Sequence, residues 1–434
     1  MRRSIAALLT LALSFTLATL LTVTTQSSVF SQTYPEVVCP PTLNGLSSQI
    51  SIASRKTAFQ RLATKSAKTA PFNLLRYPVA KDSLVISAQG STPVIWQSRA
   101  GSWAGGALCT GPISSQWFVG GSADVRTRGH IVIINSGLSA AIVDLQTYSE
   151  NGKQPTVSVN VMAKTFKTIS LDSLATGDKS LTVQVVARSG RINAFMIDEL
   201  GAGLKALGGD FVNPISSASK TLVIPVIPNQ ILKKKEKTAS AHIVRLLAPS
   251  DVDANFTLEV ISKSGIFVPV GFNSRSISAG VVTELVLSPR LAANSFAVRI
   301  TSDEPIVAAI SSQFITNGRK DFVWSTPTSA LTPMTMAVTG LSPLIAFAAD
   351  SIAVKIEVAL DRGKKSIVTI KGNDVATWQV PKSAHSITII QASRDTYAGA
   401  LVASINGYGY FPVASGSQLT KVEIPHSNIR VLNP

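Results

Sequence analysis

Paired carboxylates carry out much of hydrolytic chemistry, so the acidic residues of this chain are its first candidates for a catalytic site. A glycosidase needs two of them facing each other across a cleft at a defined separation. The acidic residues here fall instead near predicted strand ends and turns, where turn polarity accounts for them, and the Asp251-x-Asp253 loop is too sparse for calcium, which takes six or more oxygens. These residues are Asp198, Glu199, Asp251, Asp253, Asp303, Glu304 and Asp321.

No string of residues has the surroundings that a catalytic nucleophile needs. Ser217-x-x-Lys220 matches a penicillin-recognising string, but it precedes a predicted strand and lacks partner motifs. The histidines do not cluster, because His130 and His242 each begin an equivalent predicted strand. Two cysteines and four scattered histidines are also too few for a metal site. The sequence therefore predicts a non-enzymatic protein with no catalytic residues, no cofactor and no metal.

Two tryptophans offer one possible binding surface. Trp96 and Trp103 lie on neighbouring predicted strands joined by the turn at residues 98–101. Aromatic rings across a hairpin can form a flat platform for a sugar, with Arg99 nearby as a hydrogen-bond donor. The same rings can equally pack in a core. Both interpretations stay open at this point.

A run of lysines offers a second surface, made of Lys233, Lys234, Lys235 and Lys237. The run lies between two predicted strands, so it is either a solvated loop or a loop that attracts anionic wall polymers or lipid head groups. The formal net charge of +16 agrees with an anionic partner. Nucleic acid is disfavoured, because aromatic residues for base stacking do not interleave with the basic ones.

The N-terminus and the two cysteines predict export. Arg2 and Arg3 precede an uncharged run over residues 5–23, which is typical of a signal peptide or an N-terminal membrane anchor (a transmembrane helix). Cys39 and Cys109 make an even count, which favours a disulfide in an exported protein. We therefore expect an extracytoplasmic protein at the cell surface, either anchored to the cytoplasmic membrane or secreted.

A threefold repeat indicates the fold that must position these residues. A strand-like phrase ending in glycine recurs at 140–152, 255–265 and 353–363. A second strand-like phrase follows each of them at 181–186, 296–300 and 387–390, and a small-residue strand comes next at 192–197, 306–310 and 398–403. Segments rich in Val, Ile and Thr, bounded by Asn-Gly and Ser-Gly turns, indicate β-strands throughout.

The period of the repeat suits tandem immunoglobulin-like β-sandwich units, so we predict an all-β fold after the N-terminal signal or anchor helix. A β-propeller is the alternative architecture. The predicted boundaries are a signal or anchor at 1–33, a truncated β unit at 34–114, and three sandwich repeats at 115–214, 215–319 and 320–434, the last with a C-terminal strand.

Two stretches resemble a known family. The run from Cys109 to Gly121, Cys-Thr-Gly-Pro-Ile-Ser-Ser-Gln-Trp-Phe-Val-Gly-Gly, leads to the strand His-Ile-Val-Ile-Ile-Asn-Ser-Gly at 130–137. These phrases, with Gly-Gly-Asp-Phe-Val-Asn-Pro at 208–214, resemble an actinobacterial family of secreted or membrane-anchored proteins, domain of unknown function 5719. In that family the first phrase reads Cys-Pro-Gly-Pro and the strand ends in Asn-Pro-Gly, so the match is imperfect. The resemblance implies export and a β-sandwich-like body but no activity.

Taken together, these patterns predict an exported envelope protein that acts as a structural or adhesive scaffold and presents β-surfaces to a protein partner or the cell wall. Its N-terminal segment would contact the membrane. The alternative is a binding module for cell-wall glycan or an anionic polymer, using the tryptophan pair or the lysine run.

Overall fold

The structure is a computed structural model that describes residues 36–62, 70–88, 90–203, 205–229, 242–316 and 319–417. Residues 34–417 form one compact unit. The described part of the chain is built from β-strands, with two single-turn 3₁₀ helices at Leu171–Ser173 and Asp361–Gly363. The predicted all-β class is confirmed.

Four consecutive groups of strands make up this unit. The first group, residues 36–108, forms two antiparallel four-stranded sheets, ordered β1-β6-β3-β4 and β5-β2-β8-β9. Its strands are β1 (Glu36–Cys39), β2 (Ser47–Ser51), β3 (Ala58–Arg61), β4 (Ala70–Pro71), β5 (Arg76–Val79), β6 (Leu84–Ser87), β8 (Val94–Arg99) and β9 (Trp103–Leu108).

The second group, residues 115–212, also forms two sheets. One is ordered β10-β16-β12-β13, with β14 also paired to β12, and the other is ordered β15-β11-β17-β18. The strands are β10 (Ser115–Val119), β11 (His130–Asn135), β12 (Ala141–Ser149), β13 (Gly152–Lys153), β14 (Val157–Val161), β15 (Thr165–Ser170), β16 (Leu181–Ser189), β17 (Ile192–Ala202) and β18 (Lys205–Val212).

The third group, residues 219–325, is held together by one long strand, β25, which pairs with β19 and β21 in its first half and with β20 and β26 in its second. Strand β22 forms the edge beyond β21. The strands are β19 (Ser219–Pro228), β20 (His242–Leu247), β21 (Ala254–Ser262), β22 (Gly265–Phe267), β23 (Arg275–Ile277), β24 (Thr283–Leu287), β25 (Ser295–Thr316) and β26 (Arg319–Ser325).

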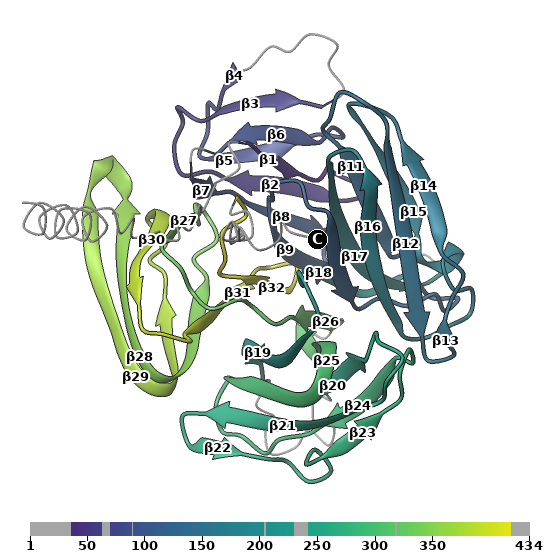
Figure 1. Cartoon of the computed structure of the whole chain (residues 1–434). Helices are drawn as coiled ribbons and strands as arrows, with labels where there is room; N and C mark the ends of the chain where they lie inside the picture. Colours follow the sequence, from purple (N-terminus) through teal and green to yellow (C-terminus); the bar gives the residue numbers. More distant parts are fainter. Residues whose placement is uncertain are drawn as a thin grey trace, which may run out of the picture. The chain divides into compact units, whose positions relative to one another are not determined.

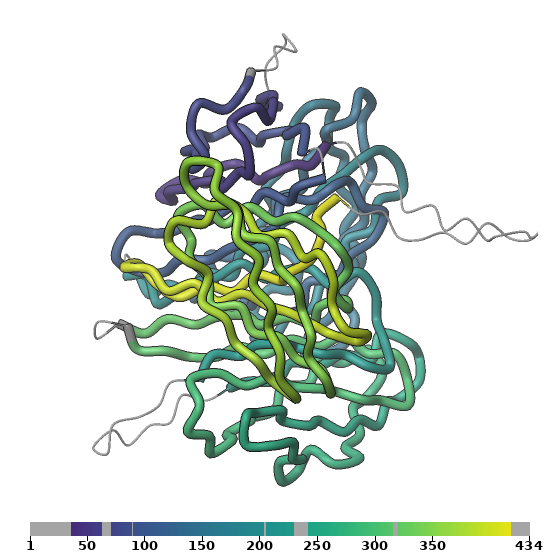
Figure 2. The backbone as a smooth tube through the Cα atoms, turned by 90° about the vertical axis from the view of Figure 1, so that its left-hand side faces the viewer, coloured from purple at the N-terminus to yellow at the C-terminus, as the bar shows by residue number. Residues whose placement is uncertain are grey.

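The fourth group, residues 334–412, has the order β32-β31-β28-β30-β27, and the short strand β7 (Ser91–Thr92) of the first group adds to β27 in parallel. Figure 2 shows its long β28–β29 hairpin in yellow-green on the side that faces the viewer. The strands are β27 (Met334–Ala337), β28 (Leu344–Leu360), β29 (Lys365–Gln379), β30 (Ala384–Ala392), β31 (Tyr397–Ala403) and β32 (Tyr408–Pro412).

The repeat in the sequence corresponds to a repeat in strand pairing. In each copy the first phrase pairs antiparallel with the second, as β12 with β16, β21 with β25 and β28 with β30. The glycines that end the three first phrases, Gly152, Gly265 and Gly363, all take a positive φ. A side chain is disfavoured in that conformation, which is why glycine recurs there. Gly190, in the Ser-Gly turn that follows β16, also takes a positive φ.

The strand groups close into a ring. Each group ends in a hairpin whose last strand lies toward the middle of the unit, and these inner strands are β9, β18, β26 and β32 (Figure 1). Strand β9 packs beside β18, β18 beside β26, β26 beside β32, and β32 beside β9. The arrangement is therefore propeller-like, which is the alternative architecture, and tandem immunoglobulin-like sandwiches are not confirmed.

Apolar layers fill the space between neighbouring groups of this ring. One layer joins the first group to the second, a larger one joins the second to the third, two small ones join the third to the fourth, and one joins the fourth back to the first. Burial of these faces supplies the main drive for closing the ring.

The predicted N-terminal helix at 5–23 lies outside the described residues. Among the residues that are described, the structure contains no helix that could span a membrane.

Candidate functional site

The two cysteines form a disulfide that ties the start of the first group to its end. Cys39 ends β1 and Cys109 follows β9, and their Cα atoms are 4.6 Å apart. Both residues are fully buried. The predicted pairing is confirmed, and a disulfide is consistent with an extracytoplasmic location.

The two tryptophans lie on the predicted hairpin, β8 and β9, but their rings are buried. Trp96 is 8% exposed and Trp103 is fully buried. Trp96 packs against Gly106 and Gly409, and Trp103 packs against Gly209. Neither ring therefore offers a flat exposed face for a sugar, and core packing, the other interpretation of this pair, describes what the structure shows.

Arg99 has a partner that its sequence position did not reveal. Its Nε donates to Oε1 of Glu199 at 2.5 Å and its Nη2 donates to Oε2 at 2.9 Å. Such a two-point pair fixes both groups in one geometry. Because Arg99 lies on β8 and Glu199 on β17, the pair joins the first strand group to the second. The side chain of Glu199 is only 4% exposed.

The most polar part of the interior lies where the inner strands meet. Asp210 on β18 accepts a hydrogen bond from the backbone N–H of Trp324 on β26 at 2.9 Å. Asp321 on β26 accepts one in return from the backbone N–H of Gly209 on β18 at 3.1 Å. Each carboxyl thus cross-links its own strand to the facing strand. The two interior acids therefore join neighbouring inner strands of the ring.

Glycines let the other two inner strands approach these carboxyls. A Cβ on Gly105 of β9 would lie 2.3 Å from Oδ1 of Asp210. A Cβ on Gly407, just before β32, would lie 2.6 Å from Oδ2 of Asp321. Side chains are therefore excluded at both positions. The carboxyl pair sits against all four inner strands or their immediate ends.

A third buried carboxyl lies between the second and third groups and is linked to Asp210 through Trp324, whose backbone N–H binds Asp210. Oδ2 of Asp198 accepts a hydrogen bond from Nε1 of Trp324 at 2.8 Å. The guanidinium of Arg245 lies over the Trp324 ring, 4.8 Å from its centroid. Arg245 also donates to the carbonyl oxygens of Gly121 and Leu181 and pairs with Glu284. Asp198 is therefore a structural residue here.

Burial governs the protonation of the three acids. It raises the pKa of Asp321 to about 7, against the opposing effect of the backbone N–H donors of Gly209 and Phe322. Burial also raises the pKa of Asp210 well above its usual value, and the nearby Asp321 carboxyl raises it further. Burial also raises the pKa of Asp198. Around the carboxyl pair, a neutral form of at least one acid is thus favoured at neutral pH.

The remaining candidate residues take structural positions. Asp253 accepts a hydrogen bond from the backbone N–H of Ala279, and Asp303 accepts from both the backbone and the side chain of Asn255. His130 and His242 begin β11 and β20, as predicted. Within the ranges that the structure covers, no group of three or more His, Cys, Asp or Glu residues could hold a metal ion.

The predicted lysine loop, Lys233, Lys234, Lys235 and Lys237, lies outside the described residues. Its attraction to anionic polymers stays a prediction.

Sequence reasoning missed Asp210 as a partner of Asp321. A signal was present, because the phrase Asp-Phe-Val occurs both at 210–212 and at 321–323. The two copies occupy equivalent inner strands, β18 and β26, so the repeat extends to the centre of the ring. The closeness of the two acids is visible only in the fold, since more than a hundred residues separate them in the sequence.

A pocket of about 480 Å³ opens in the fourth group. It crosses the ends of four neighbouring strands, because Leu344 of β28 is paired with Gln379 of β29 and Leu401 of β31, and Ala403 of β31 is paired with Tyr408 of β32. The other lining residues come from the loops before β28 and after β29: Gly340, Leu341, Ser342 and Lys382.

Comparisons with known proteins give a family but no activity. Five chains of solved structures match, among them one titled "Crystal Structure of Thermotoga maritima 1070", with 13% identity and a TM-score of 0.22 over 26% of this chain and 94% of the other. A search of curated proteins finds no match. Residues 63–377 match the family described as "Family of unknown function (DUF5719)". Because the match spans most of the sequence, this chain belongs to the DUF5719 family.

Proposed function

We propose that this protein is a non-enzymatic, exported envelope protein whose β-sheet body is a structural or adhesive scaffold for a protein partner or the cell wall. In this proposal residues 5–23 direct export or hold the protein at the membrane. The observation that carries it is the use of the interior acids, Asp198, Asp210 and Asp321, as cross-links between strand groups. Carboxylates that are buried and hydrogen-bonded between strands are poorly placed to act on a substrate.

The first experiment incubates the purified full chain with isolated cell-wall sacculi and measures release of soluble wall fragments. A scaffold releases no more than a heat-inactivated sample. Release above that blank would contradict the proposal.

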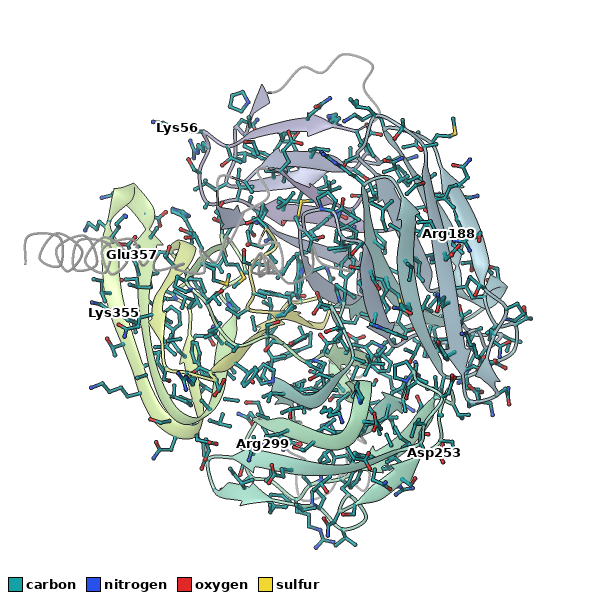
Figure 3. The ribbon with its side chains drawn as sticks, in the orientation of Figure 1. Lys56, Arg188, Asp253, Arg299, Lys355 and Glu357 are labelled. Atoms are coloured by element: carbon teal, nitrogen blue, oxygen red, sulfur yellow. A yellow bond between two sulfur atoms is a disulfide. The ribbon has the colours of Figure 1, made fainter. Side chains whose placement is uncertain are left out.

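A second candidate function, binding of an anionic wall polymer, is favoured by one exposed sheet face. Val354, Ile356 and Val358 of β28 are buried, so the alternate residues of this strand face outward. Figure 3 shows Lys355 and Glu357 on this outer side. On the paired strand β29, the residues opposite outward-facing positions include Lys365 and Lys371. We name Lys355, Lys365 and Lys371 the lysine face.

The spacing of the lysine face suits an extended polymer more than a single small anion. Lys365 and Lys371 are six residues apart on one strand, which is about 20 Å. Lys355 lies between them on the next strand, in register with Thr369. Glu357 offsets part of the charge, because its Oε1 lies 2.8 Å from the Nζ of Lys365.

Co-sedimentation with sacculi at low and high salt tests this second function. Screening of exposed charges predicts binding that weakens with salt and falls in a Lys355→Gln/Lys371→Gln variant. A Lys56→Gln/Lys167→Gln variant removes the same charge elsewhere and is the matched control. Equal losses in both variants would show that only net charge matters and would reject the lysine face as the site.

A further inference from the structure

The pocket in the fourth group combines an apolar floor with a polar rim. Leu341, Leu344 and Leu401 line it together with the ring of Tyr408, and Leu341 and Leu401 are buried beneath it. Ser342, Gln379 and Lys382 supply the polar groups. The volume of this pocket lies in the range of small-molecule sites, and its lining offers both apolar and polar contacts.

The polar rim is held in place by its own hydrogen bonds. The hydroxyl of Ser342 donates to the carbonyl oxygen of Val380 at 2.6 Å. The amide Nε2 of Gln379 donates to the carbonyl oxygen of Ser342 at 2.7 Å. Ser342 takes a positive φ of 44°, a conformation that non-glycine residues seldom adopt. The loop and the end of β29 are therefore fixed against each other.

The charge around the pocket is positive. Lys382 is the charged side chain in the lining, and it has no acidic partner among the described residues. Arg76 lies behind the lining at Gly340, where a Cβ would be 3.3 Å from its Cδ. Its guanidinium donates to Gln49, Ser51 and the carbonyl oxygen of Thr339, and within the described ranges it pairs with no carboxylate. Two cationic groups thus stand at or beside the pocket, and neither is paired with a carboxylate of the described residues.

From these observations we infer that the pocket binds a small organic acid, with its apolar body against Leu344, Leu401 and Tyr408 and its single carboxylate beside Lys382. The leucines favour a ligand with an apolar body over a fully polar anion, and the exposed ammonium of Lys382 adds a modest attraction for a carboxylate. The binding site does not depend on the scaffold function or on the lysine face.

The test uses three probes with the purified full chain, measured by isothermal titration calorimetry. Octanoate has both the apolar body and the carboxylate, octanol has the body alone, and acetate has the head group alone. Octanoate should bind, octanol should bind roughly fivefold more weakly, and acetate should not bind detectably, because a partly exposed ion pair contributes up to about 1 kcal/mol. Absence of octanoate binding overturns the inference.

Two variants locate the site. Lys382→Gln should weaken octanoate roughly fivefold and leave octanol unchanged. Ala403→Phe adds bulk to the pocket from an exposed strand end and should abolish binding of both probes, with the melting temperature confirming that the variant is folded. Lys365→Gln, on the lysine face, is the charge-matched control and should have no effect. Octanoate binding that survives Ala403→Phe in a folded protein overturns the inference, whatever the sacculus experiments show.

Discussion

Asp321 shows how single residues of this protein couple stability to pH. Its Oδ1 accepts hydrogen bonds from the backbone N–H groups of Gly209 and Phe322, yet burial raises its pKa to about 7. An unfolded aspartate titrates near 4. Between roughly pH 4 and pH 7 the native state therefore holds a proton that the unfolded state has released, so stability is lost as the pH rises through this window.

We expect Asp321→Asn to flatten that pH dependence, because the amide oxygen can accept the same two N–H donors without a charge. Melting temperatures of the two proteins should converge near pH 4, and the variant should be the more stable above pH 7. His242 acts in the opposite direction, since burial lowers its pKa to about 4 and stability is lost on acidification below its usual value. The measurement is therefore the difference between variant and wild type at each pH. A difference that does not change with pH would show that Asp321 is ionised in the native state.

The carboxylate of Glu199 is buried, whereas its partner Arg99 is partly exposed. Removing Arg99 should therefore lower the stability of the fold, because it leaves a buried charge unpaired. Arg99→Met removes the guanidinium that donates both hydrogen bonds to the Glu199 carboxylate and should lower the free energy of unfolding by about 3 kcal/mol. Arg126→Met, which removes the exposed pair with Asp124, is the control and should change it by less than about 1 kcal/mol. Urea unfolding at neutral pH gives both values. Equal small effects would mean that Glu199 is readily solvated.

At the scale of elements, the inner strands depend on glycine for close approach. A Cβ on Gly209 of β18 would lie 2.9 Å from the backbone oxygen of Asp198 and 2.9 Å from the Trp103 ring. The backbone oxygen belongs to β17 and the ring to β9, so neither can yield without moving a strand. The close packing of the inner strands thus rests on the absence of side chains at such positions.

Gly209→Ala should therefore lower the free energy of unfolding by about 1–3 kcal/mol through overpacking. Gly372→Ala in β29 is the control, because its Cβ would meet only the Cβ of Ala376 at 3.4 Å and should cost less than about 0.5 kcal/mol. Chemical denaturation of the two variants checks the contrast. A destabilisation of Gly372→Ala as large as that of Gly209→Ala would contradict overpacking as the cause.

At the scale of the whole unit, the ring is closed by contacts between its first and last groups. Strand β7 pairs with β27, and the backbone N–H of Gly416 donates to the hydroxyl of Thr92 at 2.9 Å. The side chain of Asn213 donates to the carbonyl oxygens of Gly106 and Tyr410. It thereby joins three of the four groups at the centre. Such contacts should make the groups fold as one body.

We therefore expect one cooperative unfolding transition for residues 34–417. The tryptophans report on all four groups, and far-UV circular dichroism reports on the sheets as a whole. The two signals should give the same midpoint and slope in urea. Separate transitions would show that at least one strand group is stable alone, as a string of independent sandwiches would be.

The sequence by itself determined the local features of this protein. The first six residues of β21 alternate between buried and more accessible positions, because side chains of a strand point to opposite faces in turn. The repeated glycines mark turns with positive φ, and the two cysteines pair as expected. These features depend on residues close in sequence or on an even count of one residue type.

Only the tertiary structure decided which faces pack together. The sequence around Trp96 and Trp103 is compatible with an exposed platform or with a core. The rings are buried because the fold places glycines of other strands against them, including Gly209 and Gly409. Likewise Arg99 meets Glu199, and Asp210 meets the strand of Asp321, across separations of about a hundred residues. The alternation of apolar and polar residues predicts that a strand has a buried face. Which neighbouring strand covers that face depends on how the ring closes.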